Sequence, residues 1–402
     1  MLSFIKLIPE KLSRVTSGRK LIKEIDGLRF MAILPVLIQH MAERFERNTT
    51  INFTTPLSEN GFAFLASRGF LGVYLFFVIS GFILALPFAS SRLNNTKKVK
   101  LSDYYWRRVT RLEPPYIFWI TIFFLVIIFY GQRNFLEYLP HYLANLTYTH
   151  GLIYKEWSPI NPPTWTLEIE IQFYILAPFL THLFFSIKNK TLRRVCNLFI
   201  ILGLMVAQQY LKFYANPANL SILGHLHYFL IGFMLADIYL CDWSTKIKKQ
   251  TIYDFTAVLA LGTLIYIFSW EFNFTNRILV VALLFTFFYS VFKGNYVNRF
   301  VSNKWIMSIG GMCYTIYLIH LPLAELIVVF TKNIHITNYY SVNLLVQLLI
   351  FLPIVLALSA LFFLFFEKPF MNKDWSKSLF SNFPKYANSL VPFKYVLGRK
   401  TK

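Results

Sequence analysis

Ten apolar segments of bilayer-spanning length constrain this chain more than any other feature of its sequence. About 20 apolar residues are needed for a helix to cross a bilayer. Only helices are plausible, because the backbone polar groups must be paired within the lipid. The pattern predicts an all-α, polytopic membrane protein with about ten transmembrane helices. The segments are 27–43, 69–89, 114–131, 168–187, 195–212, 221–240, 252–270, 277–292, 306–331 and 342–366, and the shorter stretch 139–148 is expected to be a re-entrant or surface piece.

The composition indicates that lipid is the solvent for most of the chain. Only 15% of the 402 residues are charged and 56% are hydrophobic, whereas about 25% of an ordinary soluble domain is charged. This balance excludes a cytosolic enzyme, a disulfide-stapled secreted domain and a disordered regulator. The three cysteines, Cys196, Cys241 and Cys313, are too far apart to indicate a disulfide framework or a metal site, and we expect no metal.

The net charge of +21 is explained better by membrane topology than by nucleic-acid binding, because the basic residues lie in short loops between the apolar segments. With the N-terminus inside, 31 Lys and Arg side chains lie on the cytoplasmic side and eight on the opposite side, while Arg29 lies within the first segment. This asymmetry predicts that both termini are cytoplasmic. It also predicts a multi-pass protein of the inner (plasma) membrane with no nucleic-acid partner.

Three parts of the chain follow from these spans. Residues 1–24 are expected to form an uncleaved cytoplasmic tail, because they are basic and contain no long apolar core. Residues 25–366 form the expected transmembrane domain, and residues 367–402 a basic cytoplasmic tail too short for a second domain. No internal repeat is present, so the inverted-repeat sign of many transporters is missing.

The first segment carries two polar side chains that are costly in lipid, Arg29 and His40. An α-helix turns about 20° beyond three full turns between them and advances ~16 Å, so both side chains share one face. Such a helix is expected to line a path across the bilayer, with Arg29 near the cytoplasmic end and His40 near the outer end. Histidine suits proton transfer from a hydroxyl near neutral pH. The alternative is that both side chains extend to the nearest headgroups.

A second polar focus lies at the start of the fourth segment, from Pro162 to Tyr174. Glu168 is explained equally well by the preference of acids for the first turn of a helix. Glu170 lies deeper, on the same side of the membrane as His40. We therefore expect a His–Glu pair in which Glu170 orients or electrostatically supports the imidazole.

A third focus is the arginine cluster before the third segment, Arg107, Arg108 and Arg111. Arg107 and Arg111 are expected to share a helical face, and arginine clusters bind phosphates in a bidentate manner. Lipid phosphate would satisfy an ordinary positive-inside anchor equally well. Two further polar residues lie within spans: His320 needs a partner, and Ser80 is expected to bond across helices or to line the cavity.

Six of these segments together resemble the acyltransferase 3 family of membrane acyltransferases. Their order along residues 26–369 is also similar to that family, which makes the set more specific than any single motif. The segments are Asp26-Gly27-Leu28-Arg29 with His40, Gly72 to Phe82, Arg107-Arg108-x-x-Arg111 with Pro114 and Tyr116, Pro163-Thr164-Trp165-Thr166-Leu167 with Glu170 and Phe173-Tyr174, Tyr314 through Tyr317 to His320 and Pro322, and Glu367-Lys368-Pro369.

This resemblance implies about ten helices, an acyl-CoA donor and transfer to a hydroxyl, often on a surface carbohydrate. It implies that Arg29 and His40 are essential, that Glu170 is their partner, and that the arginine cluster and Ser80 contact the donor. Asp26, Trp165 and His320 are further site candidates. The chain departs from the family pattern at Tyr74, where an acid is frequent, and at Thr166, where Ser is usual. We expect no appended SGNH-type hydrolase domain.

The sequence therefore favours an integral-membrane O-acyltransferase. Its partners are the lipid bilayer, acyl-CoA (acetyl-CoA in the first instance) as co-substrate without a bound cofactor, and a carbohydrate or lipid-linked glycan as acceptor. His40 would deprotonate the acceptor hydroxyl or first take the acyl group. The alternative function is a multi-pass transporter or exporter of a surface glycan or small acid, which explains the spans and the intramembrane Arg29 and His40 equally well. A third, weaker alternative is a helical lipid-organising protein without chemistry.

Overall fold

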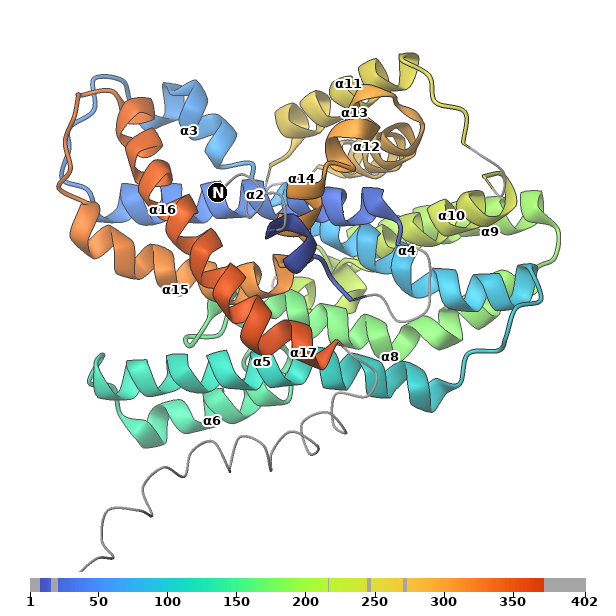
Figure 1. Ribbon diagram of the computed structural model, residues 1–402, viewed down its shortest axis with the longest axis horizontal. Helices are drawn as coiled ribbons and strands as arrows, with labels where there is room; N and C mark the ends of the chain where they lie inside the picture. The colour runs from blue at the N-terminus through green and yellow to red at the C-terminus, as the bar shows by residue number, and fades with distance from the viewer. Residues whose placement is uncertain (1–7, 16–20, 216, 244–246, 270–272, 372–402) are drawn as a thin grey trace, which may run out of the picture.

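A computed structural model describes residues 8–15, 21–215, 217–243, 247–269 and 273–371, and within these ranges the regular structure is helical with no strand (Figure 1). The all-α, polytopic fold predicted from the sequence is confirmed. Eight helical stretches in the described ranges are long and apolar enough to cross a membrane. Two further apolar helices, α10 and α11, have 16 residues each, which corresponds to a rise of ~24 Å.

Each expected segment corresponds to a helix or, for 306–331, to two helices, and most helices begin and end within about five residues of the expected bounds. The exception is α5, which begins at Leu101, whereas the expected segment begins at residue 114. The last helix continues into a π-helical turn, Phe363–Glu367. The helices are α2 (Lys23–Asn48), α4 (Leu71–Leu93), α5 (Leu101–Phe129), α8 (Trp165–Ser186), α9 (Lys190–Leu211), α10 (Leu226–Cys241), α11 (Ile252–Ile267), α12 (Phe274–Lys293), α14 (Lys304–Gly311) with α15 (Cys313–Thr331), and α16 (Tyr340–Phe362).

The expected segment 306–331 is divided at Met312 into α14 and α15. Helix α14 packs closely on α2, because a Cβ atom on Gly310 would lie 1.7 Å from the carbonyl oxygen of Asp26. Short helices fill the connections: α3 (Gly61–Ala66), α6 (Phe135–Leu146), α7 (His150–Tyr154) and α13 (Tyr296–Val301). The expected surface piece 139–148 is thus part of α6, which lies beside α5 (Figure 1).

Helix α2 runs through the middle of the molecule and joins its two apolar cores (Figure 1). It packs directly against α4, α13, α14, α15 and α16. Its first half belongs to the core that also contains residues of α4, α8, α10 and α12, and its second half belongs to the core that contains residues of α5, α15 and α16. In lipid such contacts stabilise mainly by van der Waals packing. The buried residues of α2 are Ile25, Leu28 and Ala32 in the first core, and Ile33, Leu37, Met41, Ala42 and Phe45 in the second.

The most extensive helix–helix contact among the described residues is that of α4 with α10, where two glycines face each other. A Cβ atom on Gly81 would lie 2.0 Å from the carbonyl oxygen of Phe229, and one on Gly232 would lie 2.3 Å from the amide nitrogen of Phe82. Small residues allow helix backbones to approach this closely in membranes. The crossing fixes the position of Ser80, the neighbour of Gly81, against α8.

Both expected tails contribute to the packed part of the molecule. Leu12 belongs to the second core, and Arg14 lies against Asp26 of α2. At the other end, Glu367 is fully buried, although the expected domain boundary placed it in the C-terminal tail. Residues 1–7, 16–20 and 372–402 of the expected tails lie outside the described residues.

Candidate active site

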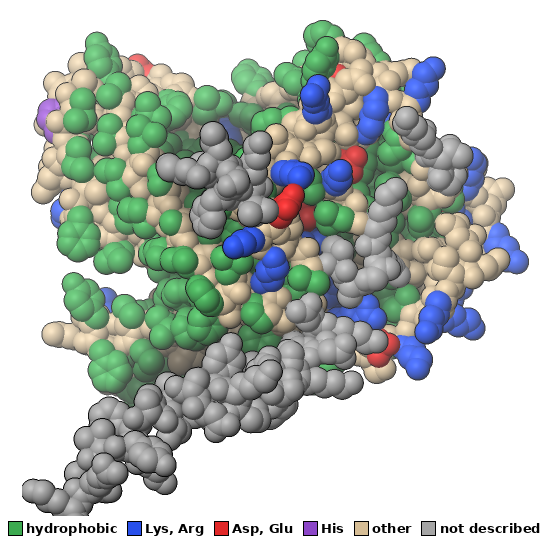
Figure 2. All heavy atoms as spheres, viewed as in Figure 1, with side chains coloured by type: hydrophobic (Ala, Val, Ile, Leu, Met, Phe, Trp, Pro, Cys, Tyr) green, Lys and Arg blue, Asp and Glu red, His purple; other side chains and the backbone are tan. Residues whose placement is uncertain are grey.

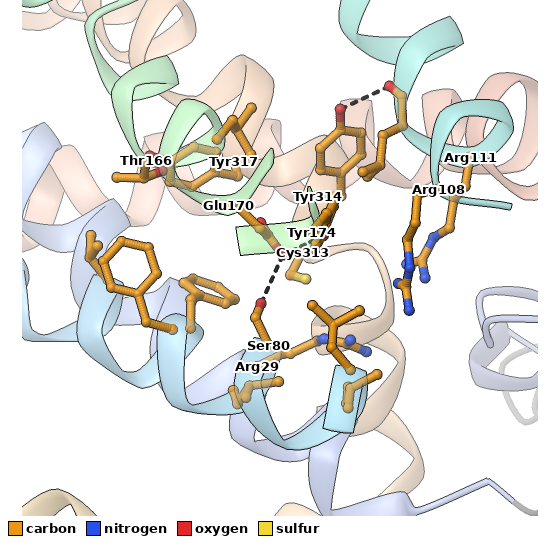
Figure 3. A pocket seen from close by; sticks show the side chains of 18 residues that line it. Arg29, Ser80, Arg108, Arg111, Thr166, Glu170, Tyr174, Cys313, Tyr314 and Tyr317 are labelled. Atoms are coloured by element: carbon orange, nitrogen blue, oxygen red, sulfur yellow. Dashed lines mark hydrogen bonds between the residues drawn. The ribbon is translucent and has the colours of Figure 1, made fainter. Parts of the chain in front are cut away.

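A cavity of about 880 Å³, its open mouth included, lies between α2, α4, α5, α8 and α15. Its walls combine apolar side chains with three arginines and a single carboxylate (Figure 3). A bundle interior that contains several cations suits an anionic ligand with an apolar part. The polar and sulfur-bearing residues of the wall are Arg29, Ser80, Arg108, Arg111, Thr166, Glu170, Tyr174, Cys313, Tyr314 and Tyr317.

Arg29 is held in the first turns of α2 by Asp26, whose Oδ1 lies 2.6 Å from Arg29 Nη1. The same carboxylate oxygen lies 3.3 Å from Nε of Arg14. Burial and the nearby charge of Arg29 lower the pKa of Arg14 to about 9. Asp26 is therefore shared by Arg14 and Arg29, so the positive charge near Arg29 is only partly compensated.

Two of the three clustered arginines face the cavity, and they differ from the pair expected from the sequence. Arg108 and Arg111 extend from α5 into the same space as Arg29, whereas Arg107 is exposed and lies outside the cavity wall (Figure 3). The reason is that α5 begins at Leu101 and buries Tyr104 and Pro115. Arg108 and Arg111 share the face of these two buried residues, and Arg107 is turned by about 100° from Arg108.

Glu170 lies in the cavity wall, but it does not pair with His40 as expected. Its Oε1 accepts hydrogen bonds from the Ser80 hydroxyl at 2.7 Å and from the Tyr174 hydroxyl at 2.5 Å. Ser80 thus does both things that the sequence allowed: it bonds across helices and lines the cavity. The carboxylate ties α4 to α8 and contributes the negative charge among the three arginines.

The partner of His40 is His320, and the two imidazoles bring α2 and α15 together. Nδ1 of His40 lies 2.7 Å from Nε2 of His320, and the rings stack with centroids 4.9 Å apart. His320 is fully buried, whereas His40 is partly accessible. Both residues were candidates from the sequence, but His40 was expected to pair with Glu170. Residue spacing alone does not determine how α15 is rotated about its axis.

The hydrogen bonds of His320 fix the protonation pattern of the pair. Nδ1 of His320 lies 2.7 Å from the carbonyl oxygen of Tyr317, which can only accept, so this nitrogen carries the proton. A neutral His320 then has an unprotonated Nε2, which accepts from Nδ1–H of His40. Nε2 of His40 is therefore left as a proton acceptor, which is the form needed for a general base.

Tyr317 connects the cavity with this histidine pair. It lines the cavity, and its ring centroid lies 5.5 Å from that of His320 on the next turn of α15. Its hydroxyl donates to the carbonyl oxygen of Pro163 at 2.6 Å and lies 2.6 Å from the Thr166 hydroxyl. The segment around Pro163 and Thr166 thus positions the side chain between the cavity and the imidazoles.

Trp165 and Glu168, from the same segment, lie outside the cavity wall. The Trp165 ring stacks on Phe70 with centroids 5.7 Å apart. Glu168 accepts a hydrogen bond from the amide nitrogen of Gly151 at 2.8 Å and so fixes the short helix α7. Trp165 and Glu168 thus stabilise the segments around Phe70 and Gly151 and do not line the cavity.

Sequence reasoning missed two groups near the arginines. Arg14 was assigned to the tail, and no local signal marks its pairing with Asp26. Glu367 was recognised only as part of a closing motif; it is buried, accepts a 2.5 Å hydrogen bond from the Thr315 hydroxyl and is acted on by the charge of Arg111. Among the residues described, no group of three or more His, Cys, Asp or Glu side chains could hold a metal ion.

Comparison with known proteins agrees with this arrangement. The sequence profile of the acyltransferase domain, acyltransferase 3, matches residues 22–364. The O-acetyltransferase OatA of Staphylococcus aureus (strain NCTC 8325 / PS 47) is 25% identical over 395 residues, which cover 92% of this chain and 60% of the relative. A putative O-acetyltransferase of Staphylococcus aureus (strain COL) is 24% identical over 409 residues, which cover 93% of this chain and 62% of the relative.

The chain thus spans about 60% of the length of the curated relatives it matches. No solved structure matches the chain. The family match covers most of the sequence and includes the three arginines of the cavity and both stacked histidines. The resemblance seen in the sequence motifs is confirmed: the chain belongs to the acyltransferase 3 family of acyltransferase domains.

Proposed function

We propose that this protein is a membrane-bound O-acyltransferase that moves an acyl group, acetyl in the first instance, from cytoplasmic acyl-CoA to a hydroxyl of a cell-surface or lipid-linked carbohydrate. The observation that carries the proposal is the arginine-lined cavity whose wall residue Tyr317 adjoins the His40–His320 pair. Membership of the acyltransferase 3 family and the O-acetyltransferase names of the relatives support the same reaction class.

The arginine end of the cavity faces the cytoplasm in this proposal. Arg29 lies in the first turns of α2, and Arg108 and Arg111 lie in the first turns of α5. The excess of Lys and Arg on that side of the sequence supports the orientation. In the view of Figure 2, blue side chains gather over the centre and right of the molecule, where the second halves of α4 and α10 end, and the left is largely hydrophobic.

The donor is bound through its phosphates and its pantetheine arm. Guanidinium groups bind phosphate through two parallel hydrogen bonds, and Arg29, Arg108 and Arg111 are placed to share this task. The apolar wall formed by Val73, Phe76 and other residues suits the arm. Arg29 and His40 are ~16 Å apart along α2, so the first holds the nucleotide end while the second acts on the acyl end.

The transfer step needs one base and no bound cofactor. Nε2 of His40 takes the proton of the acceptor hydroxyl, and the hydroxyl oxygen attacks the thioester carbonyl carbon. The new ester bond forms as the carbon–sulfur bond breaks, and the proton passes to the leaving CoA thiolate. His320 holds the His40 ring in the productive tautomer and shares the positive charge that His40 acquires.

The test is acyl transfer by the purified full chain in proteoliposomes supplied with radiolabelled acetyl-CoA and a carbohydrate acceptor. Wild type should release CoA and label the acceptor, and His40→Ala should lose both by about 1,000-fold, in the range expected for removal of a general base. His335→Ala is the matched control, because His335 is exposed, hydrogen-bonds to Asn338 and lies outside the walls of both cavities.

Two results would contradict the proposal. Normal transfer by a well-folded His40→Ala protein would remove His40 from the reaction. Flux of a glycan or small acid across the proteoliposome membrane without acylation would identify the protein as a transporter instead.

A further inference from the structure

A second cavity lies at the opposite end of α2 from the arginines. Gln39, Glu43 and Glu46 of α2 form one wall, and Ser58, Phe64 and Ser67 of the following segment, which includes α3, form the other. We propose that this outer pocket binds the acceptor, a polyhydroxylated sugar, and that it disfavours an anionic ligand. The inference rests on the proposed function and adds to it a location and a charge preference for the acceptor.

Each carboxylate of the outer pocket is held at Oε1 by a neutral donor. Nε2 of Gln39 donates to Oε1 of Glu43 at 2.7 Å, and the Tyr340 hydroxyl donates to Oε1 of Glu46. A carboxylate fixed in this way can accept hydrogen bonds from ligand hydroxyls without first reorganising. Hydrogen bonds to charged acceptors are about twice as strong as neutral ones.

The other groups of the pocket are also fixed before a ligand arrives. Oε1 of Gln39 accepts from the amide nitrogen of Phe70 at 2.5 Å, so the amide cannot rotate freely. The guanidinium of Arg68 lies over the Phe64 ring, 4.2 Å from its centroid. This contact holds one face of the ring, and the ring is 37% exposed. An apolar ring beside carboxylates suits a sugar, which has C–H groups on its faces and hydroxyls at its edge.

The charges around the outer pocket disfavour an anionic ligand. Nη1 of Arg44 lies 4.0 Å from Oε2 of Glu43, but Arg44 is also paired with Glu325, so its positive charge is already compensated. Glu43 and Glu46 therefore leave the pocket wall acidic. An anionic ligand would be repelled there, whereas a hydroxyl would not.

The position of the pocket fits delivery of a hydroxyl to His40. Gln39 precedes His40 in α2, and Glu43 is ~21 Å along the helix axis from Arg29. The acyl-CoA phosphates and the acceptor would thus occupy opposite ends of one helix, with the histidine pair between them. The negative charge of the outer pocket also disfavours binding of the anionic donor there.

The first experiment compares three acceptors that differ only in charge, with labelled acetyl-CoA and the full chain in proteoliposomes. The probes are methyl glucoside, methyl glucosaminide and methyl glucuronide, which are neutral, cationic and anionic. The anionic glucuronide should be acetylated with the lowest kcat/KM. A kcat/KM for the glucuronide that equals or exceeds that for the glucoside, or CoA release without acetylation of any sugar, would overturn the inferred selectivity.

The second experiment changes the pocket carboxylates. Glu43→Gln and Glu46→Gln should raise the KM for methyl glucoside about tenfold each, the effect expected for loss of a hydrogen bond to a charged group. The KM for acetyl-CoA should not change. Glu59→Gln is the matched control, because Glu59 lies in the same connection, is exposed and is not part of the pocket wall. Equal effects on both substrates, or equal effects of Glu59→Gln, would contradict the assignment.

The third experiment measures occupancy of the pocket without catalysis. A Ser67→Cys variant carrying His40→Ala is treated with a membrane-impermeant maleimide from the outer side, and labelling is compared with the parent that has the three native cysteines. Methyl glucoside should protect the new cysteine and acetyl-CoA should not. Absence of protection would overturn the pocket even if acyl transfer occurs. Protection without transfer by the protein that carries His40 would leave the pocket in place and overturn the proposed function.

Discussion

The two ends of α2 have opposite electrostatic character. At its beginning Arg29 shares Asp26 with Arg14 and faces Arg108 and Arg111 across a large cavity. At its end Glu43 and Glu46 line a second cavity, where neutral groups hold their carboxylates. The difference shows that one helix presents a cationic surface at one end and an acidic surface at the other, with His40 between them. This arrangement suits a bisubstrate reaction in which an anionic donor and a neutral acceptor arrive from opposite sides.

A charge reversal at the cationic end gives the largest expected change. Arg111→Glu should raise the KM for acetyl-CoA about 300-fold, because it removes a charge-assisted hydrogen bond and adds a repelling carboxylate, ~3–4 kcal/mol in total. Glu43→Arg, at the other end, should leave this KM nearly unchanged. Steady-state kinetics with varied acetyl-CoA measures both values. If the two reversals shift the KM equally, the ends of α2 do not differ in their ligands.

The centre of α2 should respond in kcat rather than in either KM. His320→Ala should lower kcat about 100-fold, because the His40 ring loses the acceptor that fixes its tautomer and orientation. His320→Gln should recover much of the loss, since its amide oxygen can accept from Nδ1–H of His40. The measurement is kcat for both variants at saturating substrates. Equal losses in the two variants would point to a packing defect instead.

Substitutions of Arg107 and Arg108 should differ in their effect on acetyl-CoA binding, because the two side chains lie on different faces of α5. Arg108→Gln should raise the KM for acetyl-CoA about tenfold through loss of a charge-assisted hydrogen bond. Arg107→Gln should have little effect, because Arg107 is exposed and outside the cavity wall. Equilibrium binding of acetyl-CoA to the purified protein gives the comparison directly. A stronger effect at Arg107 than at Arg108 would show that the donor binds outside the cavity.

The smallest expected effect concerns Arg14 and pH. Burial and the charge of Arg29 lower the pKa of Arg14 to about 9, so its positive charge is present below that pH and is lost as the pH rises through it. The affinity for acetyl-CoA should fall about fivefold across this range, since one unit charge at the edge of the site is worth ~1 kcal/mol. Arg14→Gln should bind with the lower affinity at pH 7 and lose the inflection. Identical pH profiles of the two proteins would exclude Arg14 from the donor site.

The sequence was sufficient for the helices and for the presence of Arg29 and His40 on α2, whereas no motif marked Glu43 and Glu46. Apolar length located the long helices, since in lipid the backbone has few alternatives. The rotation of one helix against another was not predictable, because it depends on packing around the whole bundle. For that reason His40 was paired with Glu170 rather than with His320, and the spacing of the arginines did not show that Arg108, rather than Arg107, joins Arg111 in the cavity wall.

The break at Met312 was also missed. Gly310, two residues before it, approaches the backbone of α2 too closely for any side chain, and only the structure shows this. Within α15, Tyr317 and His320 lie three residues apart and share a face, and the structure shows His320 in contact with His40 of α2.

Because α14 and α15 are separate helices, the rotation of α15 about its axis is set independently of α14. α14 is locked onto α2 at Gly310, and α15 begins again at Cys313 with its own angular setting. One residue inserted beside Met312 would leave both helices intact but would turn α15 by about 100°. Tyr317 and His320 would then both lose their positions between the cavity and His40. A single added residue should therefore abolish activity without unfolding the protein.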